Sequence, residues 1–320
     1  MPKEIRLVAL DLDGTLLNRE KTISPRNRTA LEELHRRGVW MVPITGRPAQ
    51  GLPQAVLDLP GLRYAVTSNG ATIRDLVTGE TLLESHLDAE TALRVLDACK
   101  DFDMIRELFR DGIGYLSQAD YEILRDRYTE PAMRRYVLDT RKVLPGTVEE
   151  QLRQDGGSIE ELFFLTDSVE TKQRLHKALA DLPGIAFADP FPRDLEVITG
   201  GIDKGEALKF LLQRLDIAPE ECIAMGDGGS DVPMLQAAGI GVAMANAEEP
   251  VKAAADRVTA SCDEDGVALV LEELVLGQAS EITAAPDPFY SESNLRERKD
   301  RFDAIQNGTA IQEEHDLIEI

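Results

Sequence analysis

Residues 7–17 of the chain read LVALDLDGTLL, and this stretch decides the fold. Its first four residues are apolar, which is typical of a strand buried inside a protein. Two aspartates, Asp11 and Asp13, follow directly and precede a Gly-Thr turn. Because residues i and i+2 of a strand point to the same side, both carboxylates are expected to converge at the carboxyl end of this strand. Ligands bind at such ends in open α/β sheets, although two carboxylates in a turn can also serve as backbone caps.

Strand and helix patterns alternate on both sides of a long central segment. In the first part, Ser24 is a helix N-cap, Pro25 takes the first helical position and Gly38 ends the helix. The alternation predicts an α/β fold with a Rossmann-like parallel sheet core and helices on both faces. The expected strands lie at residues 5–10, 39–45, 65–71, 222–227, 240–244 and 257–259, and the expected helices at 24–38, 204–216, 231–239 and 248–255.

The central segment has a different pattern, in which strands come in pairs joined by short turns. Such pairs indicate an antiparallel or mixed sheet, and therefore an α+β cap domain inserted into the first domain. The expected strands are 104–109, 112–117, 159–165, 185–188 and 195–199, with helices at 88–102, 118–128 and 168–182.

These patterns predict three parts of the chain. Residues 1–82 and 190–276 form the core domain, and residues 83–189 form the cap domain. Residues 277–320 form a C-terminal tail, which is either solvated and extended or docked on another subunit of a homo-oligomer.

Composition excludes several classes of function. The chain has 320 residues with a net charge of -23, and such an acidic surface repels the phosphate backbone of nucleic acids. No apolar run reaches the roughly 20 residues that a membrane span requires. Three scattered cysteines, Cys99, Cys222 and Cys262, fit a reducing compartment. With no signal peptide in the first residues, we expect a cytoplasmic protein that binds neither nucleic acid nor membrane.

Four further polar residues stand where predicted elements meet. Thr45 ends the second strand and is followed by Gly46, whose backbone N–H is open to a ligand. Lys204 begins a helix, while Asp227 ends a strand and precedes Asp231 by four residues. All four can face one crevice with the aspartates of the first strand, because parallel strands end on the same edge of a sheet.

The motifs that carry these residues resemble one family. DLDGTLL, ITGR, SNGA, DKGEAL and GDGGSDVPML with GVAMANA are similar to those of the haloacid dehalogenase superfamily of phosphohydrolases, over roughly residues 4–275. They most resemble its Cof-type branch, with a type IIB cap between the threonine and lysine motifs. The segment between Asp13 and Thr45 holds one helix and one strand, which leaves no room for the cap of the mutase-like branch.

The resemblance implies a phosphatase that acts on a small phosphorylated metabolite, such as a sugar phosphate. It implies a Mg²⁺ site formed by the Asp11 carboxylate, the Asp13 backbone carbonyl and Asp227. Asp11 would attack phosphorus and form an aspartyl phosphate, while Asp13 would act as general acid and then as general base. Their environments should therefore separate the pKa values of these two aspartates. A phosphotransferase or phosphomutase, and a phospho-aspartate signalling module, remain the alternatives.

The resemblance also implies how phosphate is bound. Thr45, Lys204 and the backbone N–H groups of Leu12 and Gly46 would donate to the phosphoryl oxygens. Asp231 would orient the metal site or Lys204 from behind.

Three further positions within these motifs also lead to expectations. Ser230 stands where the family usually has an asparagine that contacts phosphate, so phosphate affinity or metal geometry is expected to differ. Arg47 and Asn69 are candidate substrate contacts, or else an ion-pairing residue and a turn residue. We also expect contacts between the cap domain and the substrate from Arg106, Tyr115 and Arg193. We expect no metal ligand among the four histidines, His35, His86, His176 and His315.

Overall fold

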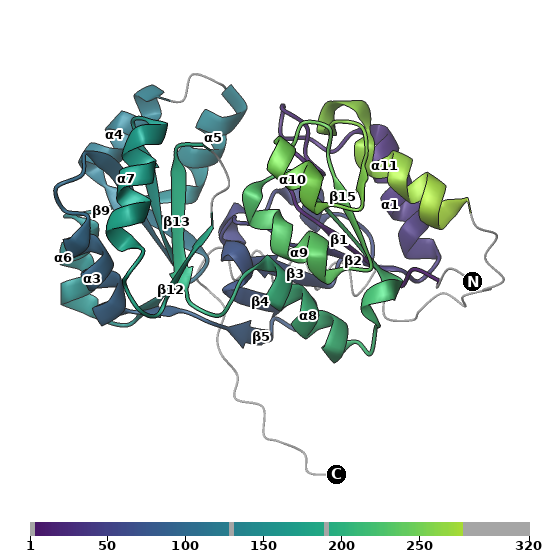
Figure 1. Ribbon diagram of the computed structural model, residues 1–320, viewed down its shortest axis with the longest axis horizontal. Helices are drawn as coiled ribbons and strands as arrows, with labels where there is room; N and C mark the ends of the chain where they lie inside the picture. Colours follow the sequence, from purple (N-terminus) through teal and green to yellow (C-terminus); the bar gives the residue numbers. More distant parts are fainter. Residues whose placement is uncertain (1–3, 128–130, 189–191, 278–320) are drawn as a thin grey trace, which may run out of the picture.

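The computed structural model describes residues 4–127, 131–188 and 192–277, which form two lobes (Figure 1). One lobe contains a parallel sheet flanked by helices, and the other contains a separate mixed sheet with its own helices. The α/β fold class with an inserted α+β domain is thus confirmed. The tail from residue 278 onward, with His315, lies outside the described residues.

The parallel sheet aligns the carboxyl ends of the two strands that carry the acidic motifs. Its order is β16-β15-β14-β1-β2, and every neighbouring pair is parallel. Leu10 at the end of β1 lies opposite Met225 of β14 and Pro43 of β2, so the residues that follow these strands emerge side by side. The strands span Leu7–Leu10 (β1), Trp40–Pro43 (β2), Cys222–Gly226 (β14), Ile240–Ala243 (β15) and Arg257–Val258 (β16).

Alternate residues of β1 enter two different apolar clusters, one on each face of the sheet. Val8 and Leu10 pack in the cluster that includes α1 and α11, whereas Leu7 and Ala9 pack in the cluster that includes α8, α9 and α10. This two-sided burial explains why the strand is apolar throughout. The helices span Pro25–Arg36 (α1), Lys204–Arg214 (α8), Val232–Ala237 (α9), Glu249–Ala254 (α10) and Gly266–Leu271 (α11), the last continued by a π-helical turn over Glu272–Leu276.

The third predicted strand pairs differently from the expectation of a continuous parallel sheet. β3 (Tyr64–Thr67) forms an antiparallel sheet with β4 (Thr72–Asp75) and β5 (Thr81–Glu84), and one isolated parallel bridge links it toward β2. The chain reverses after β3 because Ser68, Asn69 and Gly70 all have positive φ angles of 48°, 54° and 104°. Short helices lie nearby at Ala49–Gly51, Gln54–Leu57 (α2) and Ser68–Gly70.

The second lobe is built on a six-stranded sheet in the order β12-β13-β11-β7-β8-β9. All its pairs are antiparallel except β8 with β9, so the predicted mixed sheet is found. Its strands span Met104–Arg110 (β7), Ile113–Ser117 (β8), Arg141–Leu144 (β9), Glu161–Thr166 (β11), Ile185–Ala188 (β12) and Asp194–Thr199 (β13), and a small ladder joins Leu87–Asp88 (β6) to Ser158–Ile159 (β10).

Helices cover this sheet and bury two apolar clusters. The larger cluster contains the apolar sides of α3, α6 and α7, and the smaller one contains Leu124 and Val137 of the other two helices. The helices span Ala89–Ala98 (α3), Gln118–Arg127 (α4), Pro131–Thr140 (α5), Val148–Asp155 (α6) and Val169–Leu179 (α7). In the part of the chain that the structure describes, no helix is both long and apolar enough to traverse a bilayer.

Strand β13 bears on where the inserted domain ends. It lies in the 190–276 range predicted for the core, yet it pairs with β11 and β12 of the second lobe. We therefore propose that the inserted domain continues to about Thr199, while the rest of the predicted division stays a prediction.

Candidate active site

One cavity lies at the carboxyl ends of β1, β2 and β14, between the parallel sheet and the inserted domain, and it encloses a volume of about 110 Å³. A single water needs about 10–15 Å³ on this scale, so the cavity has room for a small molecule. Nearly all the residues predicted from the motifs line it, namely Asp11, Asp13, Thr45, Gly46, Arg47, Asn69, Lys204, Asp227, Ser230 and Asp231. Leu12 lies between two of them with its side chain fully buried.

Lys204 bridges two of the acidic motifs at the start of α8. Its Nζ donates to Asp11 Oδ1 at 2.9 Å and to Asp231 Oδ1 at 2.6 Å, and its side chain is only 3% exposed. Burial by itself lowers the pKa of a lysine, but the charges of Asp11 and Asp231 outweigh it and raise the pKa of Lys204 well above its usual range. Lys204 is therefore a fixed positive charge inside the cavity.

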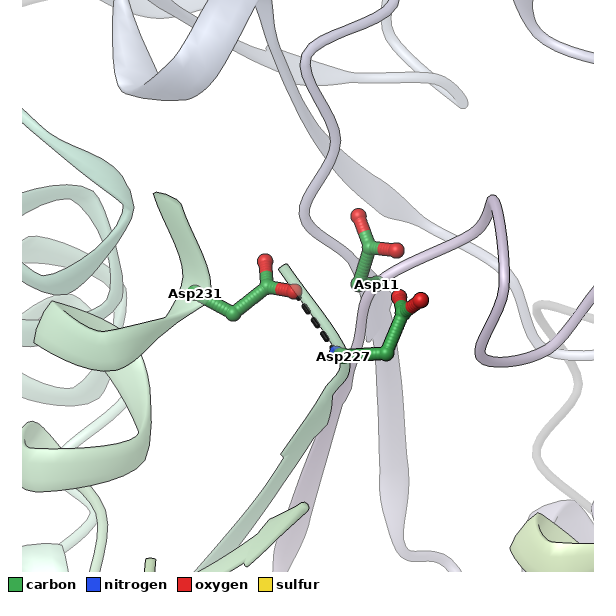
Figure 2. A group of neighbouring side chains, drawn as sticks. All are labelled: Asp11, Asp227 and Asp231. Atoms are coloured by element: carbon green, nitrogen blue, oxygen red, sulfur yellow. Dashed lines mark hydrogen bonds between the residues drawn. The ribbon is translucent and has the colours of Figure 1, made fainter. Parts of the chain in front are cut away.

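Both oxygens of Asp231 are occupied by hydrogen bonds. Oδ1 accepts from Lys204, and Oδ2 accepts from the backbone N–H groups of Asp227 and Gly228, both at 2.9 Å. Figure 2 shows the bond between Asp231 and the Asp227 N–H. This pattern holds the turn after β14 and sets the direction of the Asp227 side chain. Asp231 thus fixes the Lys204 ammonium group and the backbone beside Asp227.

Asp11, Asp227 and Asp231 each place one carboxylate oxygen within 4.8 Å of the others (Figure 2). Burial, followed by the charge of Asp231, raises the pKa of Asp11 well above its usual range, and the same two causes raise the pKa of Asp227 to about 7. Asp11 and Asp227 offer the hard oxygen donors that Mg²⁺ prefers, and its charge offsets such repulsion, whereas both oxygens of Asp231 already accept from Lys204 and from backbone N–H groups. The chemistry of the donor set therefore fits the cation that the sequence motifs imply.

Asp13 has a different environment from Asp11. Its two oxygens accept from Arg47 Nε and Nη2 at 2.5 and 2.7 Å and from Lys21 Nζ at 2.6 Å. Burial would raise the pKa of Asp13, but the hydrogen bonds and charge of Arg47, together with Lys21, hold it well below the usual range. The pKa values of the two aspartates are therefore shifted in opposite directions.

Two residues that hold Asp227 were not singled out from the sequence. Thr15 Oγ1 donates to Asp227 Oδ1 at 3.1 Å, and Asn246 Nδ2 donates to Asp227 Oδ2 and to the Gly14 carbonyl oxygen, both at 2.9 Å. Both lie inside motifs quoted above, DLDGTLL and GVAMANA, so their place in the sequence was a usable signal.

Gly14 leaves the space that Asp227 occupies. It has a φ of +87°, and a Cβ atom there would lie 2.2 Å from Asp227 Oδ2. We expect Gly14→Ala to displace the Asp227 carboxylate and to weaken divalent-cation binding at least about tenfold, measured by titration calorimetry. Gly79→Ala is the matched control, because Gly79 has a φ of +76° with nothing within 4 Å of the added Cβ. Equal cation affinity in the two variants would contradict the assigned role of Gly14.

The backbone around Thr45 offers donors to an anion. In the part of the chain described by the structure, the N–H groups of Leu12 and Gly46 donate to no other residue. Thr45 Oγ1 accepts from the Arg47 N–H at 3.1 Å, which leaves its own hydroxyl hydrogen available to a ligand. Lys204 completes a set of donors and positive charge suited to phosphoryl oxygens.

The inserted domain supplies the opposite wall of the cavity. Arg141 and Glu107 form a buried ion pair at 2.7 Å, and Tyr136 lies with its ring 4.0 Å from the Arg47 guanidinium. The predicted cap contacts are wrong, since within the described ranges Arg106, Tyr115 and Arg193 are not among the residues that line the cavity. Arg106 instead donates to the carbonyl oxygens of Cys99 and Phe102, which fixes a turn of the inserted domain.

Asn69 links this wall to the loop that carries Thr45. Its Nδ2 donates to Glu161 Oε2 at 3.0 Å and to Glu196 Oε2 at 2.6 Å, and its backbone N–H donates to the Thr45 carbonyl oxygen at 3.1 Å. Burial, and next the charge of Glu196, raise the pKa of Glu161. The neighbouring Ser68 Oγ donates to Glu160 Oε2 at 2.5 Å. The two lobes are therefore joined through buried side chains directly behind the cavity.

Comparisons with known proteins agree with this geometry. The sequence profile of haloacid dehalogenase-like hydrolases matches residues 8–271. Phosphatase YwpJ of Bacillus subtilis is 31% identical over 296 residues, covering 85% of this chain and 100% of that protein. HMP-PP phosphatase of Cronobacter sakazakii is 32% identical over 246 residues, covering 76% of this chain and 85% of that protein.

Solved structures show the same similarity. A haloacid dehalogenase-like hydrolase from B. subtilis superposes with a TM-score of 0.76 at 29% identity, covering 85% of this chain and 100% of that one. A sugar phosphatase of HAD subclass IIB superposes with a TM-score of 0.69 at 25% identity, covering 83% of this chain and 98% of that one.

Proposed function

The chain belongs to the haloacid dehalogenase-like hydrolases, as its motifs predicted, and on that basis we propose a Mg²⁺-dependent phosphatase that works through an aspartyl phosphate on Asp11. Membership among these phosphatases makes it a phosphoric monoester hydrolase that acts on small phosphorylated compounds. The metal, the intermediate and the role of each residue are the proposal.

The observation that carries the proposal is the shared cavity of Asp11, Lys204, Asp227 and Asp231 at the carboxyl ends of β1 and β14. Asp11, Asp227 and the backbone carbonyl of Asp13 would hold the cation. When bound, Mg²⁺ supplies the positive charge that lets a carboxylate approach a dianionic ester and lowers the raised pKa values of Asp11 and Asp227.

The protein's own residues then have separate tasks. Lys204, Thr45 and the N–H groups of Leu12 and Gly46 bind the phosphoryl oxygens and orient phosphorus toward Asp11. An Asp11 oxygen forms a bond to phosphorus, and the bond between phosphorus and the ester oxygen breaks.

Asp13 handles the proton in both half-reactions. It gives a proton to the leaving alkoxide and later takes one from the water that attacks the phosphoaspartate, which releases inorganic phosphate and restores Asp11. Asp13 can do so only after it exchanges its contacts with Arg47 and Lys21 for contacts with the substrate. Ser230, with its single hydroxyl, lines the cavity, and a phosphate contact remains its predicted role.

Hydrolysis of p-nitrophenyl phosphate tests the proposal. We expect turnover with Mg²⁺, a fall of about 100-fold or more after treatment with EDTA, and recovery when Mg²⁺ is returned, because the cation stabilises the transition state by several kcal/mol. Unchanged activity in EDTA would contradict the metal role. A lasting phosphoaspartate without turnover would favour the signalling module, and transfer of phosphate between hydroxyls of a sugar phosphate would favour a phosphomutase.

A further inference from the structure

We propose, on the basis of the function above, that Ser68 is a positioning residue for phosphate binding. Among the described residues, Ser68 is not one of those that line the cavity, so it acts through its neighbours. It belongs to a turn over residues 68–70, which the inserted domain holds in place. The turn in its turn fixes the loop over residues 45–47, called the phosphate loop below. Docking of the two lobes therefore sets the geometry of the phosphate loop.

The turn has a backbone conformation that residues with a Cβ atom rarely adopt. Ser68 and Asn69 have φ angles of 48° and 54°. Asparagine is enriched in this left-handed region of backbone conformations, and serine is not. Such a conformation costs free energy and persists only where the surrounding structure enforces it. The contacts of the Ser68 side chain must therefore hold the turn.

A carboxylate of the inserted domain supplies the contact. Ser68 Oγ donates to Glu160 Oε2 at 2.5 Å, and the two residues are only 0% and 3% exposed. Glu160 Oε1 accepts from the Gly112 N–H at 2.6 Å, so the carboxylate is fixed within its own domain. The Gly112 carbonyl oxygen accepts from the Gln50 N–H at 2.9 Å, which ties the inserted domain to the segment just after the phosphate loop. The turn is therefore held by lobe docking.

The turn holds the phosphate loop through two backbone hydrogen bonds. The Asn69 N–H donates to the Thr45 carbonyl oxygen at 3.1 Å. The Ser68 N–H donates to the Arg47 carbonyl oxygen at 3.0 Å. Because the Thr45 C=O and the Gly46 N–H belong to one planar trans peptide unit, they point in opposite directions. Holding the carbonyl oxygen on the turn therefore directs the Gly46 N–H away from the turn, and Gly46 lines the cavity.

The same turn also reaches the start of α8. Gly70 has a φ of +104°, and a Cβ atom there would lie 2.5 Å from the carbonyl oxygen of Asp203. Asp203 is the N-cap of the helix that begins with Lys204. The turn therefore packs on the backbone beside two groups assigned to phosphate binding, the Gly46 N–H and the Lys204 ammonium.

Two substitutions at position 68 separate the conformation of the turn from the hydrogen bond. Ser68→Ala and Ser68→Gly both lose the hydroxyl, but alanine then returns to negative φ, whereas glycine occupies positive φ about as readily. Phosphate affinity is measured as the inhibition constant of inorganic phosphate against p-nitrophenyl phosphate hydrolysis at constant Mg²⁺. We expect this constant to rise at least about tenfold in Ser68→Ala and less than about threefold in Ser68→Gly. KM should rise in parallel and kcat should change less, because the Gly46 N–H binds the phosphoryl group before the reaction as well as during it.

A matched pair of controls removes the general cost of the backbone conformation. Asp216 is exposed and has a φ of 52°, and among the described residues it is not one that lines the cavity. Asp216→Ala and Asp216→Gly should differ in Tm for the same backbone reason but leave the inhibition constant of phosphate unchanged.

A substitution in the other lobe tests the docking contact while the sequence of the turn stays native. Glu160→Ala removes the acceptor of the Ser68 hydroxyl, so the inhibition constant of phosphate should rise severalfold. Glu170→Ala, at an exposed glutamate of the same domain, should leave it unchanged.

Equal inhibition constants in Ser68→Ala and Ser68→Gly, or a native constant in Glu160→Ala, would overturn the inference while the native enzyme still hydrolyses p-nitrophenyl phosphate. If circular dichroism shows that Ser68→Ala is unfolded, the result for Glu160→Ala decides. If the native chain binds phosphate without hydrolysing the ester, the proposed function fails, and dissociation constants from calorimetry decide the inference. If it neither hydrolyses the ester nor binds phosphate, both fail.

Discussion

Replacement of Asp11 by asparagine is expected to lower kcat for p-nitrophenyl phosphate by about 10⁴-fold or more, because an amide cannot form the bond to phosphorus. The substitution keeps the size of the side chain and leaves an oxygen that can still accept from Lys204. Loss of activity should therefore come without loss of the fold.

The stability of this variant gives an independent check. Burial and the charge of Asp231 raise the pKa of Asp11 above its value in the unfolded chain, so the folded state binds more protons between the two pKa values. Stability contributed by this group consequently falls as pH rises through that range. An asparagine at position 11 has no such charge, and in EDTA at neutral pH we expect Asp11→Asn to have a Tm at least as high as the native chain.

Asp101→Asn is the matched control, since Asp101 is an exposed aspartate of the inserted domain. It should leave both kcat and Tm unchanged. If Asp11→Asn retains native activity, Asp11 is not the nucleophile and the proposed mechanism fails. If the variant is inactive and circular dichroism shows that it is unfolded, the loss of activity does not test the role of Asp11. Unfolding would then contradict the prediction that the Tm of Asp11→Asn is at least as high as that of the native chain.

The placement of the catalytic candidates could be predicted from the sequence because it follows from parallel pairing. Once β1 and β14 lie side by side, the residues after Leu10 and Gly226 must emerge at one edge of the sheet. Lys204 could be placed by similar reasoning, as a residue at the start of a helix that follows a strand. Local spacing and sheet direction were sufficient for these positions.

The partners of Asp13 could not be predicted in the same way. Arg47 lies 34 residues away from Asp13 and is, from the sequence, a candidate substrate contact, while Lys21 lies in a turn with a φ of 60°. Which of two aspartates a nearby arginine neutralises depends on side-chain direction in irregular segments. A sequence pattern does not encode that direction.

The contacts that form the facing wall of the cavity could not be predicted from the sequence either. Glu161 and Glu196 meet Asn69 from strands 92 and 127 residues away, and these contacts form only when the two lobes dock. Each lobe has its own apolar clusters, so the periodicity of its strands describes its own core and carries no signal about docking. The same reason accounts for the wrong expectation about Arg106, which serves the inserted domain internally.

Replacement of Lys204 by methionine is expected to reduce both activity and stability by large amounts. Methionine fills a similar volume but removes the charge that lies 2.9 Å from Asp11 and 2.6 Å from Asp231. Breaking a buried ion pair by removing one partner costs about 3–5 kcal/mol, since the remaining charges stay buried without compensation. Loss of one donor to the phosphoryl oxygens should lower kcat by about 10²–10³-fold.

The cation should rescue the stability of this variant more than its activity. In Lys204→Met the carboxylates of Asp11, Asp227 and Asp231 repel one another without the lysine charge between them. Mg²⁺ held by Asp11 and Asp227 would reduce this repulsion, so adding Mg²⁺ should raise the Tm of Lys204→Met more than the Tm of the native chain. The donor to phosphate remains absent, so kcat should stay low at saturating Mg²⁺. Lys209→Met is the control, because Lys209 lies on the same helix in an exposed pair with Glu206 and should affect neither quantity. A Lys204→Met variant that is as stable as Lys209→Met in EDTA would show that Asp11 and Asp231 are not held as buried carboxylates, and the electrostatic basis proposed for this site would have to be abandoned.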